Sequence, residues 1–80
     1  MKPQDPKNTD FIKAYDDFND DIFRFAYLKT KNRDMALDIT QETFTKVWEY
    51  IEAGKDIGHM RGFLYQIARN LVIDHYRKKS

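Results

Sequence analysis

Turn-forming residues are scarce in this chain. Of its 80 residues only two are proline, both within the first six, and three are glycine, at positions 54, 58 and 62. A β-sandwich needs turn signals about every 8–12 residues, so this pattern excludes one. No apolar run approaches the roughly 18 residues of a membrane-spanning helix. The absence of cysteine excludes disulfides and thiolate metal sites, and the polar N-terminus is not a secretory signal. We therefore expect a soluble, all-α, cytoplasmic protein.

Apolar side chains recur at helical spacing in three segments, which predict helices over residues 10–29, 33–53 and 60–79. The expected core face of the first helix consists of Phe11, Tyr15, Phe18, Ile22, Phe25 and Ala26. That of the second consists of Ala36, Thr40, Thr43, Val47 and Ile51, flanked by Leu37, Phe44 and Trp48. That of the third consists of Met60, Leu64, Ile67, Ala68 and Leu71. Together they predict one compact three-helix domain over residues 10–80.

Capping residues mark the ends of these segments. Residues 1–9 contain both prolines and no periodic pattern, so we expect a flexible leader, with Thr9 as the N-cap of the first helix. Asn32 is the expected N-cap of the second helix, and Gly54 is the expected stop after it.

The net charge of +1 conceals an uneven distribution. Residues 10–52 carry ten acidic and six basic side chains, a balance of −4, whereas residues 55–80 carry six basic and two acidic ones, a balance of +4. This asymmetry indicates two different partner surfaces. The alternative is a chance distribution of solvated charge.

The second helix has an acidic and polar ridge opposite its core face, edged by Trp48. The ridge consists of Asp38, Gln41, Glu42, Thr45, Glu49 and Glu52. Such a ridge could accept charged hydrogen bonds from a basic partner helix, and tryptophan is enriched in binding hot spots. The alternative is an ordinary solvated face.

The third helix has a second face that is aromatic, aliphatic and basic. Tyr65, Arg69, Val72 and Tyr76 follow one another at helical spacing, beside Gln66, Asn70, Ile73 and Arg77. Aromatic rings stack on unpaired bases and arginine neutralises phosphate, so this face predicts binding to single-stranded nucleic acid. The run from Arg77 to Lys79 adds phosphate affinity. The alternative is that Tyr65 or Tyr76 packs on the first helix, or on residues that this chain lacks.

Catalytic and metal-binding patterns are weak. His59 and His75 are sixteen residues apart with no close-spaced ligand pair, and His75 falls at the edge of the buried stripe. The aspartates between Asp16 and Asp21 lack the glycine and the twelfth-position carboxylate of a calcium loop. No glycine-rich phosphate loop is present. We expect no enzymatic activity, no metal and no cofactor.

Two segments resemble a known family. Residues 36–44, ALDITQETF, followed by Trp48, resemble the bacterial sigma-factor helix that grips core RNA polymerase. Residues 61–77, RGFLYQIARNLVIDHYR, resemble the promoter-melting and −10-element helix of the same proteins. The likeness is to region 2 of the extracytoplasmic-function group of the sigma-70 family, and it covers about residues 10–79.

The resemblance implies two binding sites. Residues at positions that bind the clamp helices of the polymerase β′ subunit are Asp38, Gln41, Glu42, Phe44, Thr45 and Trp48. Residues at positions that hold the unpaired non-template strand of the −10 element are Lys55, His59, Arg61, Tyr65, Gln66, Arg69, Asn70, Ile73, Tyr76, Arg77 and Lys78. Phe63 stands where many members have tryptophan, which removes the indole donor. An anti-sigma factor is a further partner that the resemblance suggests, and a membrane is not.

Working members of this group also have a C-terminal helix-turn-helix domain that reads the −35 element, and we expect this chain to be a fragment without it. A rival interpretation is a helical adaptor that binds the polymerase without reading DNA. A helix-turn-helix repressor is disfavoured, because its reading helix is short and follows a tight turn.

Overall fold

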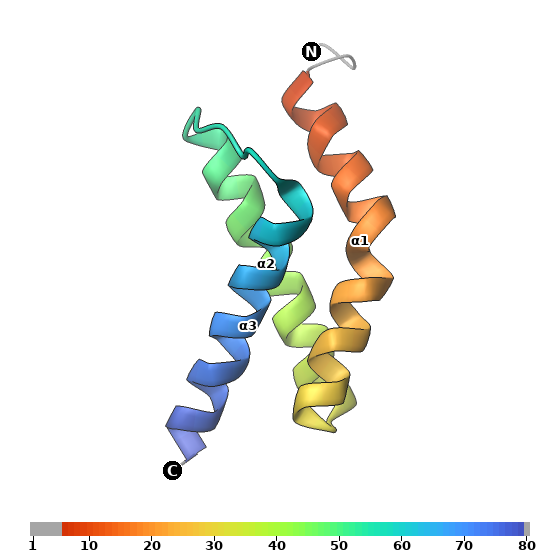
Figure 1. Ribbon diagram of the computed structural model, residues 1–80, viewed down its shortest axis with the longest axis vertical. Coiled ribbons are helices and arrows are strands. Elements are labelled where there is room, and N and C mark those ends of the chain that lie inside the picture. Colours follow the sequence, from red (N-terminus) through yellow and green to blue (C-terminus); the bar gives the residue numbers. More distant parts are fainter. Residues whose placement is uncertain (1–5, 80) are drawn as a thin grey trace.

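The computed structural model describes the backbone of residues 6–79 and the side chains of residues 9–78. This part of the chain forms three helices, α1 (Pro6–Thr30), α2 (Arg33–Glu52) and α3 (Met60–Lys79), and contains no strand. The all-α, three-helix prediction is confirmed. α1 and α2 run in opposite directions, and α3 crosses in front of α2 as it runs back down from the α2–α3 loop (Figure 1). Within residues 6–79, none of the helices has the length and apolar character to cross a membrane.

α1 begins at Pro6, four residues earlier than predicted. Proline suits the first helical position, because its φ is already helical and its missing N–H would have no partner there. Thr9 therefore lies inside the helix, and its expected role as N-cap is wrong. The expected leader is likewise wrong for residues 6–9, while residues 1–5 lie outside the described part of the chain.

The α1–α2 connection is a two-residue turn. Lys31 adopts a φ of 56°, in the left-handed region, and its N–H donates to the carbonyl of Tyr27 at 2.7 Å. This bond closes the last turn of α1. Asn32 then caps α2, with its side-chain oxygen accepting from the Met35 N–H at 3.0 Å. The predicted N-cap is confirmed.

α2 ends in a Schellman motif at Gly54. The Gly54 N–H donates to the Ile51 carbonyl at 2.9 Å, and the Lys55 N–H donates to the Tyr50 carbonyl at 3.3 Å. Gly54 has a φ of +79°, which glycine adopts without the steric cost of a Cβ. The predicted stop is confirmed, with Ala53 as the C-cap.

His59 caps the N-terminus of α3. Its Nδ1 accepts from the Gly62 N–H at 3.0 Å, and its carbonyl accepts from the Phe63 N–H at 3.0 Å. A Cβ on residue 62 would lie 3.0 Å from that same Nδ1, so glycine at this position lets the imidazole approach without being displaced. The start of α3 is thus fixed by the contact between His59 and Gly62, which the sequence pattern did not predict.

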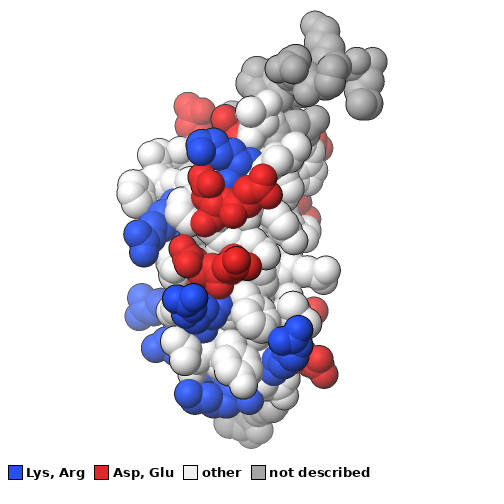
Figure 2. Space-filling view, turned by 90° about the vertical axis from the view of Figure 1, so that its right-hand side faces the viewer, with Lys and Arg blue, Asp and Glu red and all other residues white. Residues whose placement is uncertain are grey.

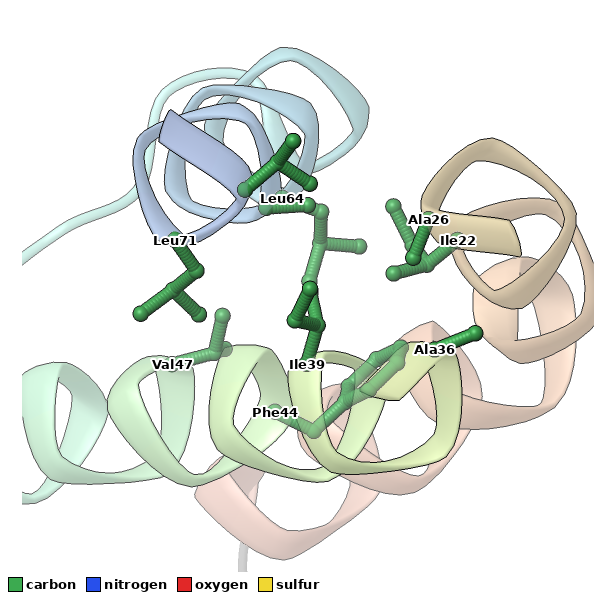
Figure 3. Packing of buried hydrophobic residues seen from close by; sticks show 10 residues of the cluster. Ile22, Ala26, Ala36, Ile39, Phe44, Val47, Leu64 and Leu71 are labelled. Carbon is green, nitrogen blue, oxygen red and sulfur yellow. The ribbon is translucent and has the colours of Figure 1, made fainter. Parts of the chain in front are cut away.

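The core joins all three helices. Ile22 of α1, Ile39 and Val47 of α2, and Leu64 of α3 are fully buried. Figure 3 shows Leu64 and Leu71 directed toward Ile39 and Val47, with Ile22 and Ala26 alongside. The predicted stripe of α3 is confirmed at Leu64, Ala68 and Leu71, whereas Ile67 is only partly buried.

Ile39 was absent from the predicted core face because a single stripe was assumed for α2. The helix packs on both α1 and α3, so its buried face is wider than one stripe. Thr40 and Thr43 are also buried there, and their hydroxyls donate to the Ala36 and Ile39 carbonyls at 2.7 Å. These bonds satisfy both hydroxyls inside the core.

Gly54 and Gly58 provide a matched test of the turn after α2. Gly54→Ala should destabilise the chain by about 1 kcal/mol, because the Cβ of alanine clashes with the backbone at a left-handed φ. For a domain of this size, thermal unfolding followed by circular dichroism should show a fall of about 4–8 °C in Tm. Gly58→Ala should leave Tm unchanged or slightly raised, since a Cβ there meets open space at an ordinary φ. Equal effects of the two substitutions would contradict the Schellman assignment.

The His59 cap can be tested by removing and then replacing its acceptor. His59→Ala should lower the free energy of unfolding in urea by about 0.5–2 kcal/mol, the usual cost of losing an N-cap. His59→Asn should recover most of that loss, because asparagine is a favoured N-cap residue. If the alanine variant unfolds at the wild-type urea concentration, the Nδ1 bond does not stabilise α3.

Candidate functional site

A groove runs between the N-terminal half of α1 and the solvent-facing side of α2. It has a volume of about 600 Å³ and is lined by Phe11, Tyr15, Gln41, Phe44, Thr45 and Trp48. Four of these six residues belong to the predicted polymerase-binding set. They come together because positions 41, 44, 45 and 48 follow helical spacing along one side of α2. The remaining two come from α1.

Aromatic rings form the floor of this groove. The Phe11 ring meets Trp48 edge-on at 5.2 Å between ring centroids, and Tyr15 lies 5.0 Å from Phe44. Phe44 is only 2% exposed and belongs to the core. The expected direct contact at Phe44 is therefore corrected, because its ring supports the groove from beneath.

Sequence reasoning assigned Phe11 and Tyr15 to the core and so missed their place in the groove. Tyr15 is 44% exposed and Phe11 partly so. Their helical spacing shows that they face α2, but it does not show how much of each side chain α2 covers and how much stays exposed to solvent. Only the relative placement of the two helices supplies that information.

The predicted ridge of α2 borders the groove. Asp38, Gln41, Glu42 and Thr45 are all exposed. The Thr45 hydroxyl donates to the Gln41 carbonyl at 2.9 Å, which holds its oxygen close to the helix. The ridge presents carboxylates beside an apolar hollow, an arrangement suited to a partner helix with basic and apolar residues.

A second hollow lies where the α2–α3 loop meets α3. Its volume is about 390 Å³, and it is lined by Tyr50, Asp56, Ile57, Gly58, His59, Gly62, Phe63 and Gln66. Tyr50 packs on Phe63 with their centroids 4.7 Å apart, and the Lys55 ammonium lies 5.1 Å from the Tyr50 centroid. Three predicted nucleic-acid residues, Lys55, His59 and Gln66, therefore gather around one hollow.

The exposed strip of α3 differs from the predicted line. Val72 is only 5% exposed and belongs to the core, so the line through Tyr65, Arg69, Val72 and Tyr76 is not a free surface. The predicted residues of α3 with solvent-exposed side chains are Arg61, Gln66, Arg69, Asn70, Ile73, Tyr76, Arg77 and Lys78, and the exposed carboxylate of Asp74 lies among them. The exposed strip thus lies beside the predicted line, on the side of Gln66, Asn70 and Ile73, and Arg69 belongs to both.

Both tyrosines of α3 contact α1. The Tyr65 ring meets Phe25 edge-on at 5.4 Å between centroids, and the Arg61 guanidinium lies 5.6 Å from the Tyr65 centroid. The Tyr76 hydroxyl donates to the backbone carbonyl of Lys29. The alternative in which these tyrosines pack on the first helix is therefore right, although Tyr76 remains 54% exposed.

Among the described residues, no three His, Cys, Asp or Glu side chains lie close enough to hold a metal ion. His75 is partly buried, as its position at the edge of the buried stripe predicted.

Comparison with known proteins identifies the family of the chain. The family model described as Sigma-70 region 2 matches residues 14–80. The ECF RNA polymerase sigma factor SigM of Bacillus subtilis (strain 168) is 36% identical over 66 residues, which are 82% of this chain and 40% of SigM. The ECF RNA polymerase sigma factor BldN of Streptomyces coelicolor is 34% identical over 71 residues, which are 84% of this chain and 26% of BldN.

The RNA polymerase sigma factor SigV of Bacillus subtilis (strain 168) is 29% identical over 80 residues, all of this chain and 48% of SigV. The chain thus spans less than half the length of each of these relatives. No solved structure matches it significantly. The family is one of transcription initiation factors rather than enzymes, and the chain belongs to it, as a sigma-70 region 2 of the ECF RNA polymerase sigma factors.

Proposed function

We propose that this chain binds core RNA polymerase through the groove and ridge of α2 and holds the melted −10 promoter strand through α3 and the loop before it. The observation that carries the proposal is the match to Sigma-70 region 2 over residues 14–80. It is supported by the geometry, because the residues assigned to each role gather on separate surfaces. Both partners are cytoplasmic in bacteria, where we place the protein.

The polymerase side of the proposal rests on two kinds of contact. The groove, with Phe11, Tyr15 and Trp48 in its lining, offers an apolar recess for a side chain of the β′ clamp helices. Asp38 and Glu42 stand exposed beside it and would accept charged hydrogen bonds from basic residues of that partner. An anti-sigma factor is a further proposed partner, since it would inhibit by covering this same groove.

The DNA side rests on the exposed strip of α3. Gln66 and Asn70 carry paired donor and acceptor groups that can read the edges of unpaired bases. Arg69 and Lys78 supply cations for phosphates, and Ile73, 40% exposed, offers an apolar contact for a base. At the upper end of this strip, the hollow with Lys55 and His59 nearby would receive a base turned out of the stack.

A helical adaptor that binds the polymerase without reading DNA is the second candidate. The packing of Tyr65 and Tyr76 on α1 favours it, because this packing removes aromatic surface that a strand would otherwise stack on. The two candidates share the α2 interface and differ only in DNA binding.

The polymerase interface predicts a selective loss of affinity. Asp38→Ala and Gln41→Ala should each weaken binding to a fragment of the β′ clamp helices by about 1–3 kcal/mol, because each removes a hydrogen bond to a charged or polar partner. Isothermal titration calorimetry would measure the change. Asp20 is an exposed aspartate on the outer face of α1, so Asp20→Ala is the matched control and should bind like the wild type. Unchanged affinity for both α2 variants would show that the polymerase does not bind this ridge.

The DNA interface predicts two different losses. Asn70→Ala should flatten the ranking among single strands of different sequence, because it removes a base-edge contact. Arg69→Ala should lower affinity for all sequences alike and make the salt dependence shallower by about 0.7 in log–log slope, because it removes a phosphate contact. Fluorescence anisotropy with a panel of short single strands separates these outcomes. If the chain binds no single strand at low salt, the adaptor candidate is favoured.

A further inference from the structure

Four side chains form a row that crosses from α3 to α1, with two aromatic rings in the middle and a cation at each end. The Arg61 guanidinium lies 5.6 Å from the centroid of Tyr65, and Tyr65 meets the Phe25 ring edge-on at 5.4 Å. The Lys29 ammonium lies 5.7 Å from the Phe25 centroid. Sequence reasoning had assigned the two α3 residues to nucleic-acid binding and had placed Phe25 in the core, with no binding role for Lys29.

The lower end of this row is held by a backbone contact. The Tyr76 hydroxyl donates to the Lys29 carbonyl, which ties the last turn of α1 to the C-terminal part of α3 across 47 positions. Lys29 and Arg61 are exposed, while Phe25 and Tyr65 are partly buried. Arg69 follows Tyr65 by one turn and precedes Tyr76 by two, so it shares the side of α3 on which these two tyrosines contact α1. The seam between the helices is therefore lined by rings and edged by cations.

The charges of α1 are divided along its length. All its acidic residues among the described positions precede Ile22 and are accompanied there by Lys13, whereas Arg24 and Lys29 follow, with Lys31, Arg33 and the acidic Asp34 just beyond its end. In the view onto the α1 side, acidic side chains gather in the upper and middle part and basic ones dominate the lower part (Figure 2). The part of α1 up to Asp21 would therefore repel an anionic chain, and the part after Asp21 would attract one.

We propose that α1 is part of the nucleic-acid interface and that the Lys29 ammonium contacts a backbone phosphate of a single strand lying along the seam between α1 and α3. The inference rests on the proposed function, since it extends the strand that α3 holds. The contact with the Phe25 ring places the Lys29 ammonium at the edge of the seam, where a phosphate of the strand would meet it. The strand then runs from the α2–α3 loop toward the C-terminal ends of α1 and α3, with Lys29 and Arg69 on its two sides.

The test compares two variants that each remove one positive charge from α1, one at Lys29 and one at Arg24. In fluorescence anisotropy with short labelled single strands over a series of salt concentrations, Lys29→Gln should weaken binding about three- to tenfold at low salt for every sequence. Its log–log salt slope should be shallower by about 0.7, the loss of one phosphate contact. Lys29→Arg should retain the wild-type slope. Arg24→Gln, on the exposed outer face of α1, should also retain it. Circular dichroism and thermal melting check that each variant is folded.

Two results overturn the inference and leave the proposed function intact. One is a wild-type slope in Lys29→Gln while Arg69→Gln loses binding, which confines the strand to α3. The other is an equal loss in Lys29→Gln and Arg24→Gln, which reflects overall charge rather than a contact. If the wild-type chain binds no single strand, the DNA role of α3 fails and the seam contact fails with it.

Discussion

α2 is buried on two adjacent sides, against α1 on one and against α3 on the other, and only its third side meets solvent. Ile39 and Val47 are fully buried, and the Thr40 and Thr43 hydroxyls are satisfied by backbone carbonyls of the same helix. This arrangement leaves a single face of α2 for a partner and turns the free face of α3 elsewhere. The separation of the two proposed interfaces is thus a consequence of how the core is packed.

Local signals in the sequence were sufficient for the helices and most of their ends. Asn32 and Gly54 act through bonds within a few residues of themselves, so their roles are readable without knowing the fold. The Thr9 N-cap prediction failed because Pro6 provides an equally good local start further upstream. Ile39 was missed for a different reason, since its burial depends on α3 lying beside α2.

The sequence predicts most of the residues that make up the candidate sites, but it does not predict which side of each helix faces solvent. The residues of the α2 groove follow from helical spacing, yet its far wall, Phe11 and Tyr15, required the placement of α1. On α3, spacing alone could not tell which of two neighbouring lines of residues faces solvent. Contacts with α1 decide this, because Val72 enters the core and Tyr65 and Tyr76 contact Phe25 and the Lys29 backbone. The same contacts bring α1 to the edge of the proposed strand-binding face.

Two separate surfaces are proposed to bind two different partners. Chemical-shift mapping on the isotope-labelled chain, titrated in turn with a β′ clamp-helix fragment and with a −10-like single strand, distinguishes them. The clamp fragment should shift Gln41, Thr45 and the Trp48 indole. The strand should instead shift Gln66, Arg69 and Asn70, and each ligand should bind in the presence of the other. Overlapping sets of shifted residues, or competition between the two ligands, would contradict this proposal.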